Sequence, residues 1–538
     1  MHRGSHRELA WEEQLVVASQ GGRRGYAGSG ATARALRSTR VRVRAIWAVA
    51  VLLFAIIFAR ILYLQIFESG QHILLSEANH IELLQEPAPR GVIYDRNGIP
   101  IVANEPGLAT ESGHTVTTYT RSYPYGAAFA PILGYMSEVT SDELGCRDGV
   151  CYTPGMLVGR AGLERTLDPI LRGKDGGRLL EVDASGKVVR ELGSNRPEAG
   201  NDVTLTVDAR LQTLLYNALG GKPGSAVAVD MQGKILAMVS SPSYDPSNIA
   251  RYLTDTTEHY FLDRAISGTY PPGSVFKLVT SYAALASGAI TPTTLIDDTG
   301  ILTVGQYSYR NWYYDEYGRV EGNINVVTAI AHSNDIFFYK AGEMTGVDTL
   351  VSWARQFGFG ERTGVELPSE ATGLVPDRLQ KERATGEKWF LGNTYHLAIG
   401  QGDLLVTPLQ VARMTAAAVS GRLCDTSLLV RTPINCHDLG LTGSYVTLVR
   451  QGMQGACAPG GTAFPFFTFQ PWVLCKTGTA QVGGPSDSDK SDAWITVAYP
   501  GDNPKMVLTV MLEKAGEGSY EAGPIAKDIL SAWRDMGN

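Results

Sequence analysis

The longest apolar run of the chain lies near its beginning and predicts a single membrane-spanning helix. It covers residues 45–67, close to the ~20 residues that such a helix needs. Arginines crowd residues 34–44, and Glu68 and Glu77 follow the run, so the positive-inside rule predicts a cytoplasmic N-terminus and an extracytoplasmic remainder. A cleaved signal peptide is the alternative. The run is too long for its apolar core, however, and no small-residue cleavage site follows.

Beyond residue 202, alternating apolar stretches predict strands and longer periodic stretches predict helices. The predicted strands are residues 203–207, 225–230, 234–240, 472–482, 493–500 and 506–512, and the predicted helices are residues 274–285, 331–344, 407–420 and 525–533. Asp208 is placed to cap another helix that begins near Ala209. Strands, then helices, then strands and a final helix predict an α+β domain whose first and last strands share one antiparallel sheet.

The part between the apolar run and residue 200 has a different character. It mixes short strand-like runs with glycine and proline and shows no long helical period, which predicts a small β-rich module. Asn97-Gly98 between apolar residues is a strong signal for a hairpin turn. We therefore expect four parts: a cytoplasmic tail of residues 1–44, an anchor of residues 45–67, the β-rich module of residues 68–200 and the α+β domain of residues 201–538.

The composition is that of an ordinary globular protein, with 44% hydrophobic and 19% charged residues. The net charge of −7 gives no reason to expect nucleic acid as a partner. Cysteines of an exported domain form disulfides more readily than metal sites, although free buried thiols remain the alternative. The sequence does not fix the connectivity; the local pairs are Cys146 with Cys151, Cys424 with Cys436, and Cys457 with Cys475.

Ser274 and Lys277 form the first pattern with chemical meaning. They follow two prolines and a glycine at a predicted helix entrance, and their spacing of three residues places both side chains on one face. A serine hydroxyl is a poor nucleophile unless a neighbour takes its proton, and a lysine whose pKa is lowered by burial can do so. The pattern is weak by itself, because it recurs by chance in long chains.

Two more polar motifs follow. Ser333-Asn334-Asp335 stands before an apolar stretch, where helix capping is the alternative explanation. Lys476-Thr477-Gly478-Thr479 lies inside a predicted strand, and a glycine weakens a strand unless something must approach its backbone closely. Such a strand suits the binding of a substrate carboxylate and amide. A strand that merely contains a glycine is the alternative.

Taken together, the three motifs are the SxxK, SxN-type and KTG set of penicillin-recognising serine enzymes. With them the chain resembles a class B penicillin-binding protein from the anchor to the last helix. The other similar stretches are Arg60 with residues 63–65, then residues 89–98, 159–164, 241–246, 400–402, 407–410 and 479–482. The resemblance implies one transmembrane helix, a β-rich pedestal and an α+β transpeptidase domain of the penicillin-binding and serine β-lactamase type.

Within this class the chain is more similar to the elongation type than to the division type. Its second motif ends in Asp335, where the division type usually has asparagine, and residues 309–312 are also of the elongation type. The family implies a SEDS-family glycan polymerase as a partner, bound through the anchor and pedestal. Arg60 interrupts the apolar run near its outer end. It either reaches the headgroups or contacts another membrane protein.

The resemblance also implies a mechanism of two-step acyl transfer that needs no cofactor. Ser274 attacks the terminal D-Ala-D-Ala bond of a peptidoglycan stem peptide, and Lys277 accepts its proton. Ser333 and Asp335 complete the network that carries a proton to the departing D-Ala. The backbone N–H groups of Ser274 and Thr479 form the oxyanion hole. Lys476 and Thr477, next to Gly478, hold the terminal carboxylate, and β-lactam antibiotics enter the same site.

The chain departs from its relatives at two places. Only a short stretch separates Asn104 from Arg121, so the head that elongation-type pedestals carry there is expected to be largely missing. Some relatives bind zinc in the transpeptidase domain. Asp297 stands at one such position, but Asn311 replaces another ligand. His332 is expected to pack or cap rather than to ligate, and we predict no metal.

Three other functions remain as alternatives. A D,D-carboxypeptidase or a β-lactamase would pass the acyl group to water, but the anchor, pedestal and length argue against both. Glu366 and Glu370 are the nearest candidates for activating such a water, and we expect them to be solvated loop carboxylates instead. A non-catalytic β-lactam sensor is the third possibility. The intact Ser274 and Lys277 pair argues against a pure scaffold.

Overall fold

A computed structural model describes residues 32–67, 81–111, 114–147, 150–183, 187–482 and 490–537 of the protein, with the backbone alone for residues 32–41. The chain divides into two compact units. One consists of residues 1–82 with 181–185, and the other of residues 83–180 with 186–538. The predicted cytoplasmic tail lies largely outside the described residues.

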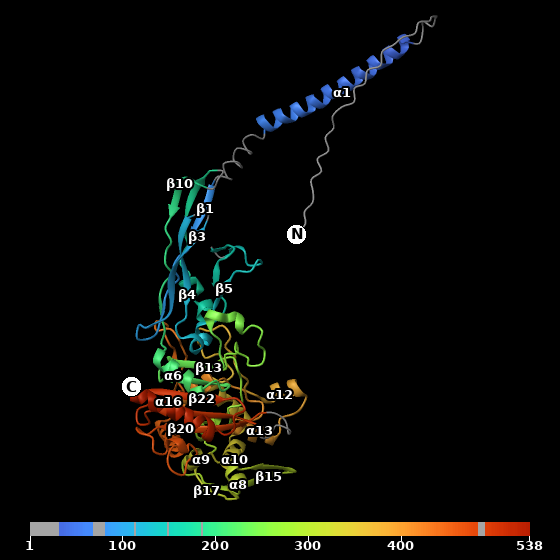
Figure 1. Ribbon diagram of the computed structural model, residues 1–538. Coiled ribbons are helices and arrows are strands. Elements are labelled where there is room, and N and C mark those ends of the chain that lie inside the picture. Colours follow the sequence, from blue (N-terminus) through green and yellow to red (C-terminus); the bar gives the residue numbers. More distant parts are fainter. Residues whose placement is uncertain are drawn as a thin grey trace, which may run out of the picture. The chain divides into compact units, whose positions relative to one another are not determined.

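The first unit contains one long helix, α1 (Thr32–Ile66; Figure 1). Its segment Arg42–Ile66 is long and apolar enough to cross a membrane, and none of that stretch is buried against the rest of the protein. This agrees with the predicted anchor of residues 45–67. The helix begins at Thr32, before the apolar run, and its first part is the arginine-rich stretch.

The predicted hairpin turn at Asn97-Gly98 is confirmed. It joins β2 (Ile93–Tyr94) to β3 (Pro100–Glu111), and Gly98 has a φ of +80°, a conformation that glycine adopts without steric cost. The sheet continues with β4 (His114–Ser122) and has the strand order β11-β2-β3-β4, where β11 is Val203–Thr204. Asn104 pairs with Arg121 in the long β3–β4 hairpin. The chain therefore has a hairpin at the place where a head was expected to be missing.

The remaining pedestal elements are short. A second sheet has the order β1-β9-β10, made of β1 (Ile81–Glu86), β9 (Gly176–Val182) and β10 (Val188–Asn195). Two small ribbons pair β5 (Met136–Glu138) with β8 (Leu157–Gly159) and β6 (Gly145–Arg147) with β7 (Val150–Tyr152). The helices here are α3 (Ala130–Leu133), α4 (Gly162–Thr166) and α5 (Asp168–Leu171).

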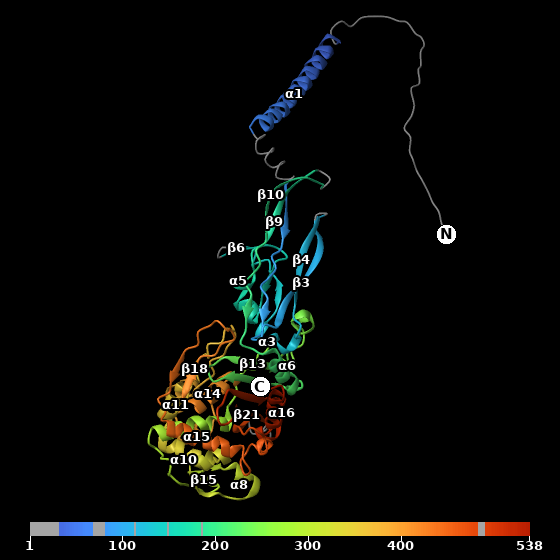
Figure 2. The same cartoon turned by 90° about the vertical axis from the view of Figure 1, so that its left-hand side faces the viewer.

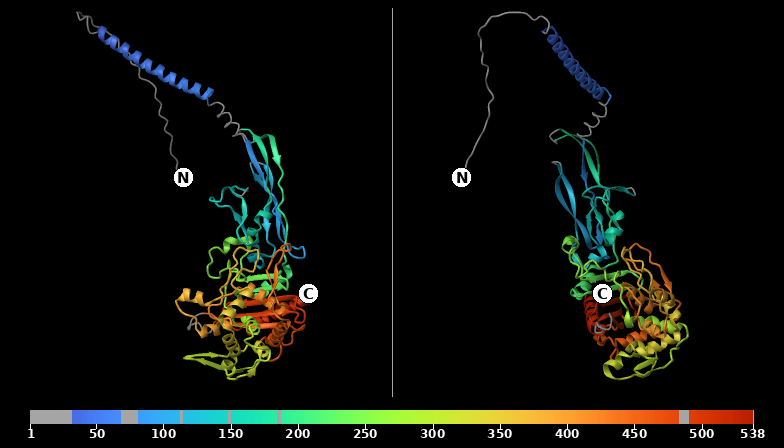
Figure 3. Two further views of the ribbon diagram at one scale, coloured as in Figure 1. Left: turned by 180° about the vertical axis from the view of Figure 1, so that it is seen from behind. Right: turned by 90° about the vertical axis from the view of Figure 1, so that its right-hand side faces the viewer.

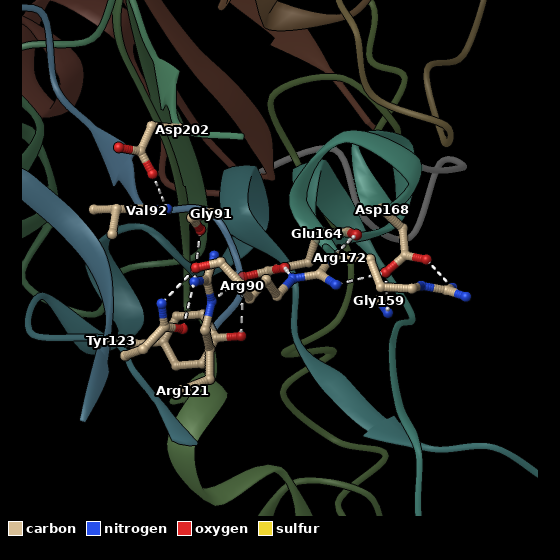
Figure 4. A network of polar contacts seen from close by, with 11 residues as sticks. Arg90, Gly91, Val92, Arg121, Tyr123, Gly159, Glu164, Asp168, Arg172 and Asp202 are labelled. Carbon is tan, nitrogen blue, oxygen red and sulfur yellow. Dashed lines mark hydrogen bonds and ion pairs between the residues drawn. The ribbon is translucent and has the colours of Figure 1, made fainter. Parts of the chain in front are cut away.

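A buried ionic network joins these pedestal elements (Figure 4). Glu164 on α4 is fully buried and accepts hydrogen bonds of 2.7 Å from Nε of both Arg90 and Arg121. Arg90 Nη1 also donates to Asp168 at 2.7 Å, and Arg172 forms an ion pair with the same carboxylate. Buried charges persist only when they are paired and hydrogen-bonded, so this network holds three separate segments of the pedestal together.

The predicted α+β domain is built on one five-stranded antiparallel sheet of order β13-β12-β22-β21-β20 (Figures 2 and 3). Its strands are β12 (Gly224–Asp230), β13 (Ile235–Ser241), β20 (Leu474–Gln481), β21 (Ser491–Tyr499) and β22 (Met506–Leu512). The first and last strands of the domain thus share one sheet, as the element order predicted.

Helices cover both faces of this sheet, and the strand residues alternate between two cores. Val227 and Val229 of β12 pack into the core that contains α7 (Lys277–Ala286) and α14 (Pro408–Ser420), whereas Ala226 and Ala228 pack into the core with α6 (Ala209–Leu219) and α16 (Gly523–Asp535). The helices are α6 (Ala209–Leu219), α7 (Lys277–Ala286), α8 (Trp312–Tyr317), α9 (Val326–His332), α10 (Asp335–Thr345), α11 (Val347–Gln356), α12 (Arg378–Thr385), α13 (Leu391–Ala398), α14 (Pro408–Ser420), α15 (Gly443–Ala456) and α16 (Gly523–Asp535). Asp208 caps α6 as predicted.

Two predicted elements differ from the structure. The helix expected over residues 331–344 is two helices, because α9 ends and α10 begins around Ser333, whose φ is +55°. The Asn334 side chain then caps α10 by accepting from Phe337 N. Of the strand expected over residues 203–207, Val203 and Thr204 pair with β2, and Leu205 forms an isolated bridge with Leu429.

All three local cysteine pairs form disulfides, so the free-thiol alternative is wrong. Cys146–Cys151 crosses β6 and β7. Cys424–Cys436 joins β18 (Arg422–Cys424) to β19 (Cys436–Asp438). Cys457–Cys475 ties the end of α15 to β20, next to the third polar motif.

Candidate active site

Ser274 lies at a tight junction between a helix entrance and strand β20. It is the second residue of the short 3₁₀ helix η3 (Gly273–Phe276), which continues into α7, and its side chain is half-buried while its two C-terminal neighbours are buried. Gly273 has a φ of +55°, and a Cβ there would lie 2.9 Å from the Thr479 carbonyl oxygen. The glycine before the serine is therefore required by the close approach of β20.

Lys277 is fully buried one turn further along and faces the second motif. Its Nζ donates to Asp335 Oδ1 at 2.7 Å, to the Ser333 carbonyl oxygen at 2.6 Å and to Ser333 Oγ at 3.3 Å. Burial lowers the pKa of Lys277, although the nearby Asp335 carboxylate opposes this shift. The ammonium is thus well held, and its environment makes the loss of a proton easier than in water.

Ser333 stands between two buried lysines. Its Oγ accepts from Lys476 Nζ at 2.8 Å as well as from Lys277 Nζ. Lys476 also donates to the Thr477 carbonyl oxygen at 3.0 Å. Burial, and next the charge of Lys277, hold the pKa of Lys476 well below its usual range. Ser333, in a left-handed conformation, presents its Oγ to both lysines and its carbonyl oxygen to Lys277.

The third motif lies on β20, the last strand in the sheet order. A Cβ at Gly478 would lie 3.0 Å from the Pro272 carbonyl oxygen and 3.2 Å from a Val275 methyl group, so the glycine admits the serine segment. The prediction of a close approach to the backbone at Gly478 is confirmed, and the approaching group is the segment of this chain that precedes and follows Ser274. Thr477 Oγ1 donates to Thr462 Oγ1 at 2.8 Å, whereas Thr479 is exposed.

The structure therefore brings the three predicted motifs together. The serine segment packs against β20, and hydrogen bonds link Lys277 to Ser333 and Asp335, and Ser333 to Lys476. It also adds residues that sequence reasoning missed. Thr462 contacts the third motif, and Gln401 Nε2 donates to the Thr479 carbonyl oxygen at 3.3 Å. Asp335 Oδ2 accepts from Trp312 N at 3.0 Å, and Asp335 N donates to Asn311 Oδ1 at 3.1 Å. Sequence similarity had marked Gln401 and Asn311 but gave them no role.

The cluster behind the second motif does not fit a zinc site. Asp297 is exposed, and its neighbour Asp298 is the buried carboxylate of this region. The amide nitrogens of Asn311 and Asn334 both point at Asp298 as hydrogen-bond donors, which occupies the face where a metal would need lone pairs. In the described parts of the chain, no group of three or more His, Cys, Asp or Glu side chains could hold a metal ion.

His332 is half-buried and is the last residue of α9. Its Nδ1 is hydrogen-bonded to Glu321 Oε1, and this bond raises the pKa of His332.

The expectation that the two loop carboxylates are solvated was wrong. Glu370 is buried and accepts from Thr363 N at 2.7 Å, and Glu366 is half-buried and accepts from Leu428 N at 2.8 Å. Both carboxylates are held by hydrogen bonds within the loops.

This arrangement suits nucleophilic catalysis at a serine. A half-exposed hydroxyl lies at the start of a helix, beside a buried lysine whose pKa is lowered and a strand at the end of its sheet. Ser333 connects Lys277 to a second buried lysine, Lys476. Such a set can attack a carbonyl, stabilise negative charge and relay a proton without a metal.

Comparison with known proteins places these features in a family context. The penicillin-binding protein transpeptidase domain matches residues 224–531, and the penicillin-binding protein dimerisation domain matches residues 110–205. The peptidoglycan D,D-transpeptidase MrdA of Salmonella typhimurium is 30% identical over 597 aligned positions, covering 91% of this chain and 95% of the relative.

Solved structures give the same result. The PBP2 of Pseudomonas aeruginosa, in complex with WCK 5153, is 31% identical with a TM-score of 0.72, covering 84% of this chain and 96% of that one. A chain of a peptidoglycan synthase complex that coordinates polymerization and crosslinking is 30% identical with a TM-score of 0.74 and covers 91% and 98% of the two chains.

Proposed function

This chain belongs to the elongation-type class B penicillin-binding proteins, and from that premise we propose that it cross-links peptidoglycan stem peptides through an acyl-enzyme on Ser274. The enzyme is a membrane-anchored serine D,D-transpeptidase that acts in cell elongation and binds β-lactams. The observation that carries the catalytic assignment is the chain of contacts Asp335–Lys277–Ser333–Lys476 beside the half-exposed Ser274. We propose the same four-part division of the chain as in the sequence analysis.

In the first step, Ser274 Oγ attacks the carbonyl carbon of the terminal D-Ala-D-Ala bond, and its proton passes to neutral Lys277. This role is supported by burial, which lowers the pKa of Lys277. The backbone N–H groups of Ser274 and Thr479 stabilise the oxyanion, where loss of one donor costs ~3–4 kcal/mol. The proton then reaches the departing D-Ala nitrogen through Ser333, and Asp335 holds Lys277 in place.

In the second step, an amine of a neighbouring stem peptide attacks the acyl-enzyme and restores Ser274. Lys476 contributes positive charge at the substrate's terminal carboxylate, and Thr477, next to Gly478, binds that group. The backbone of β20 is available for the peptide because it ends the sheet. Every step uses groups of this chain, so the proposal includes no cofactor.

We expect penicillin to acylate Ser274 and to remain bound for many minutes or longer. The strained lactam carbonyl takes the place of the substrate amide, and Glu366 and Glu370 are held by loop contacts and do not activate a deacylating water. Intact mass spectrometry and peptide mapping of the detergent-solubilised protein measure this adduct.

Ser274→Ala should abolish the adduct, whereas Ser287→Ala, at the far end of α7, should label as the wild type does. Rapid turnover of a chromogenic cephalosporin with no trapped adduct would make the protein a β-lactamase. Release of D-Ala to water alone, without transfer to an added amine, would make it a carboxypeptidase.

We also propose that the N-terminus is cytoplasmic and that residues beyond about 68 lie outside the cytoplasmic membrane. The arginines before the apolar segment of α1 and the three disulfides support this orientation. Protease added to spheroplasts should digest the transpeptidase domain. Protection of that domain in intact spheroplasts, with digestion after lysis, contradicts the orientation.

A SEDS-family glycan polymerase is the proposed membrane partner, because a similar chain occurs in a peptidoglycan synthase complex. Arg60 lies within the apolar segment, with its guanidinium 5.2 Å from the Tyr63 ring centre, and is the group best placed for a polar contact inside the membrane. Arg60→Ala should reduce co-purification with the polymerase, and Arg44→Ala, at the other end of the segment, should not. Equal recovery with both variants contradicts this contact.

A further inference from the structure

Asp298 is a buried carboxylate on which several hydrogen bonds converge behind the second motif. It ends β14 (Ile296–Asp298), which pairs with β17 (Gly322–Ile324), and only 1% of its surface is exposed. Its Oδ2 accepts from Asn311 Nδ2 at 2.9 Å, from Asn334 Nδ2 at 2.9 Å and from Glu321 N at 3.1 Å, while Oδ1 accepts from Gly300 N at 2.9 Å. An ionised acceptor makes such bonds stronger than neutral ones.

Two of these donors are side-chain amides, and each amide uses its other end on the second motif. Asn311 Oδ1 accepts from Asp335 N at 3.1 Å, and Asn334 Oδ1 accepts from Phe337 N at 2.9 Å, which starts α10. An amide presents donors on one side and an acceptor on the other. Because Asp298 is a pure acceptor, it directs the Asn311 amide oxygen toward the motif. It does the same for Asn334 together with Glu321, whose Oε2 accepts from Asn334 Nδ2 at 2.7 Å.

The segment fixed in this way carries an uncommon backbone conformation. Ser333 has a φ of +55°, which is uncommon for a residue other than glycine and persists only when its surroundings hold it. Its carbonyl oxygen and Oγ, together with Asp335 Oδ1, are the acceptors for Lys277. The other carboxylate oxygen of Asp335 accepts from Trp312 N, the residue after Asn311. The contacts around Lys277 are therefore linked to Asp298 through both asparagines.

We propose that Asp298 is a positioning residue for the transpeptidase, which orients Ser333 and Asp335 around Lys277 through Asn311 and Asn334. Hydrogen bonds and the ion pair between Lys277 and Asp335 hold the motif here. The inference rests on the proposed role of Lys277 as the base for Ser274. Asp298 itself touches neither the substrate nor the reacting atoms.

Removal of the charged acceptor tests this arrangement. Asp298→Asn removes the negative charge and one of the two acceptor oxygens, so either Gly300 N or the three donors at Oδ2 face an amide nitrogen. Asn311→Ala removes the link from Asp298 to Asp335 N. Asp297→Asn is the matched control, since it changes the exposed neighbour on the same strand.

The measurement is the acylation of the full-length protein by a fluorescent penicillin, resolved into the affinity of the initial complex and the rate constant of acylation. We expect Asp298→Asn to lower the rate constant at least ~10-fold, since misplaced reacting groups cost up to ~100-fold, while the initial affinity stays within about threefold. Asn311→Ala should lower the rate constant of acylation in the same direction, again with little change in the initial affinity.

An unchanged rate in folded Asp298→Asn overturns the proposal. If Asp298→Asn does not fold, Asn311→Ala replaces it. That change leaves Asp298 its other three donors, and wild-type acylation in Asn311→Ala overturns the proposal equally. Failure of the wild type to label at Ser274 would instead refute the proposed function.

Discussion

Replacing Lys277 by alanine should slow the acylation of Ser274 by a factor of ~10²–10⁴, the contribution of a general base. The buried ammonium has three acceptors and no solvent, and burial lowers its pKa. The wild-type acylation rate should accordingly rise with pH through a value below the usual lysine range. Stopped-flow fluorescence with a labelled penicillin measures both quantities.

Lys277→Arg distinguishes the role of Lys277 as a base from the effect of its positive charge. Arginine keeps a cation beside Asp335 but does not lose a proton in proteins, so it should be as slow as alanine. Lys340→Ala, on the exposed side of α10, is the control and should react as the wild type does. Acylation of Lys277→Arg at the wild-type rate would show that charge alone suffices and that the base lies elsewhere.

Replacing Glu164 by alanine should destabilise the pedestal by about 3–5 kcal/mol. Glu164 is the shared acceptor of Arg90 and Arg121, and removal of one partner from a buried ionic network leaves the others uncompensated (Figure 4). Hydrogen exchange of amides in residues 90–171 of the full-length protein measures the free energy of opening.

Glu198→Ala is the matched control for this change. Glu198 also pairs with a basic side chain, Lys174, but both side chains are exposed, and such pairs add little stability. Equal protection in Glu164→Ala and Glu198→Ala would contradict the structural role of the buried network. Penicillin labelling of Ser274 should persist in both variants, because the site lies in the transpeptidase domain.

The sequence predicted elements well where a single physical signal dominates. The alternating runs that became β12, β13 and β22 are bounded by glycine and proline, and Asp208 has the chemistry of a helix cap. The prediction failed at Ser333, because apolar residues continue on both sides of it and favour one helix. Its left-handed backbone depends on contacts with Lys277 and Lys476, which are distant in sequence.

The site was predictable through its three motifs, which are short and local. Asp298 was not, because its partners lie 13, 23 and 36 residues away and follow no helical or strand period. The neighbouring Asp297 has the same chemistry, and only burial distinguishes the two residues. The buried roles of Glu366 and Glu370 were missed for the same reason, since loop carboxylates are usually solvated.

The uneven burial of the active site limits how the protein can evolve under antibiotic selection. Lys277 and Lys476 are fully buried and both donate to Ser333 Oγ. A substitution at any of these three residues therefore disturbs the reaction with the natural substrate and with the drug alike. Thr479 and Gln401 reach the surface beside them. Resistance that preserves wall synthesis is therefore confined to this rim, where a larger or differently charged side chain can hinder a bulky drug while a slender peptide still enters.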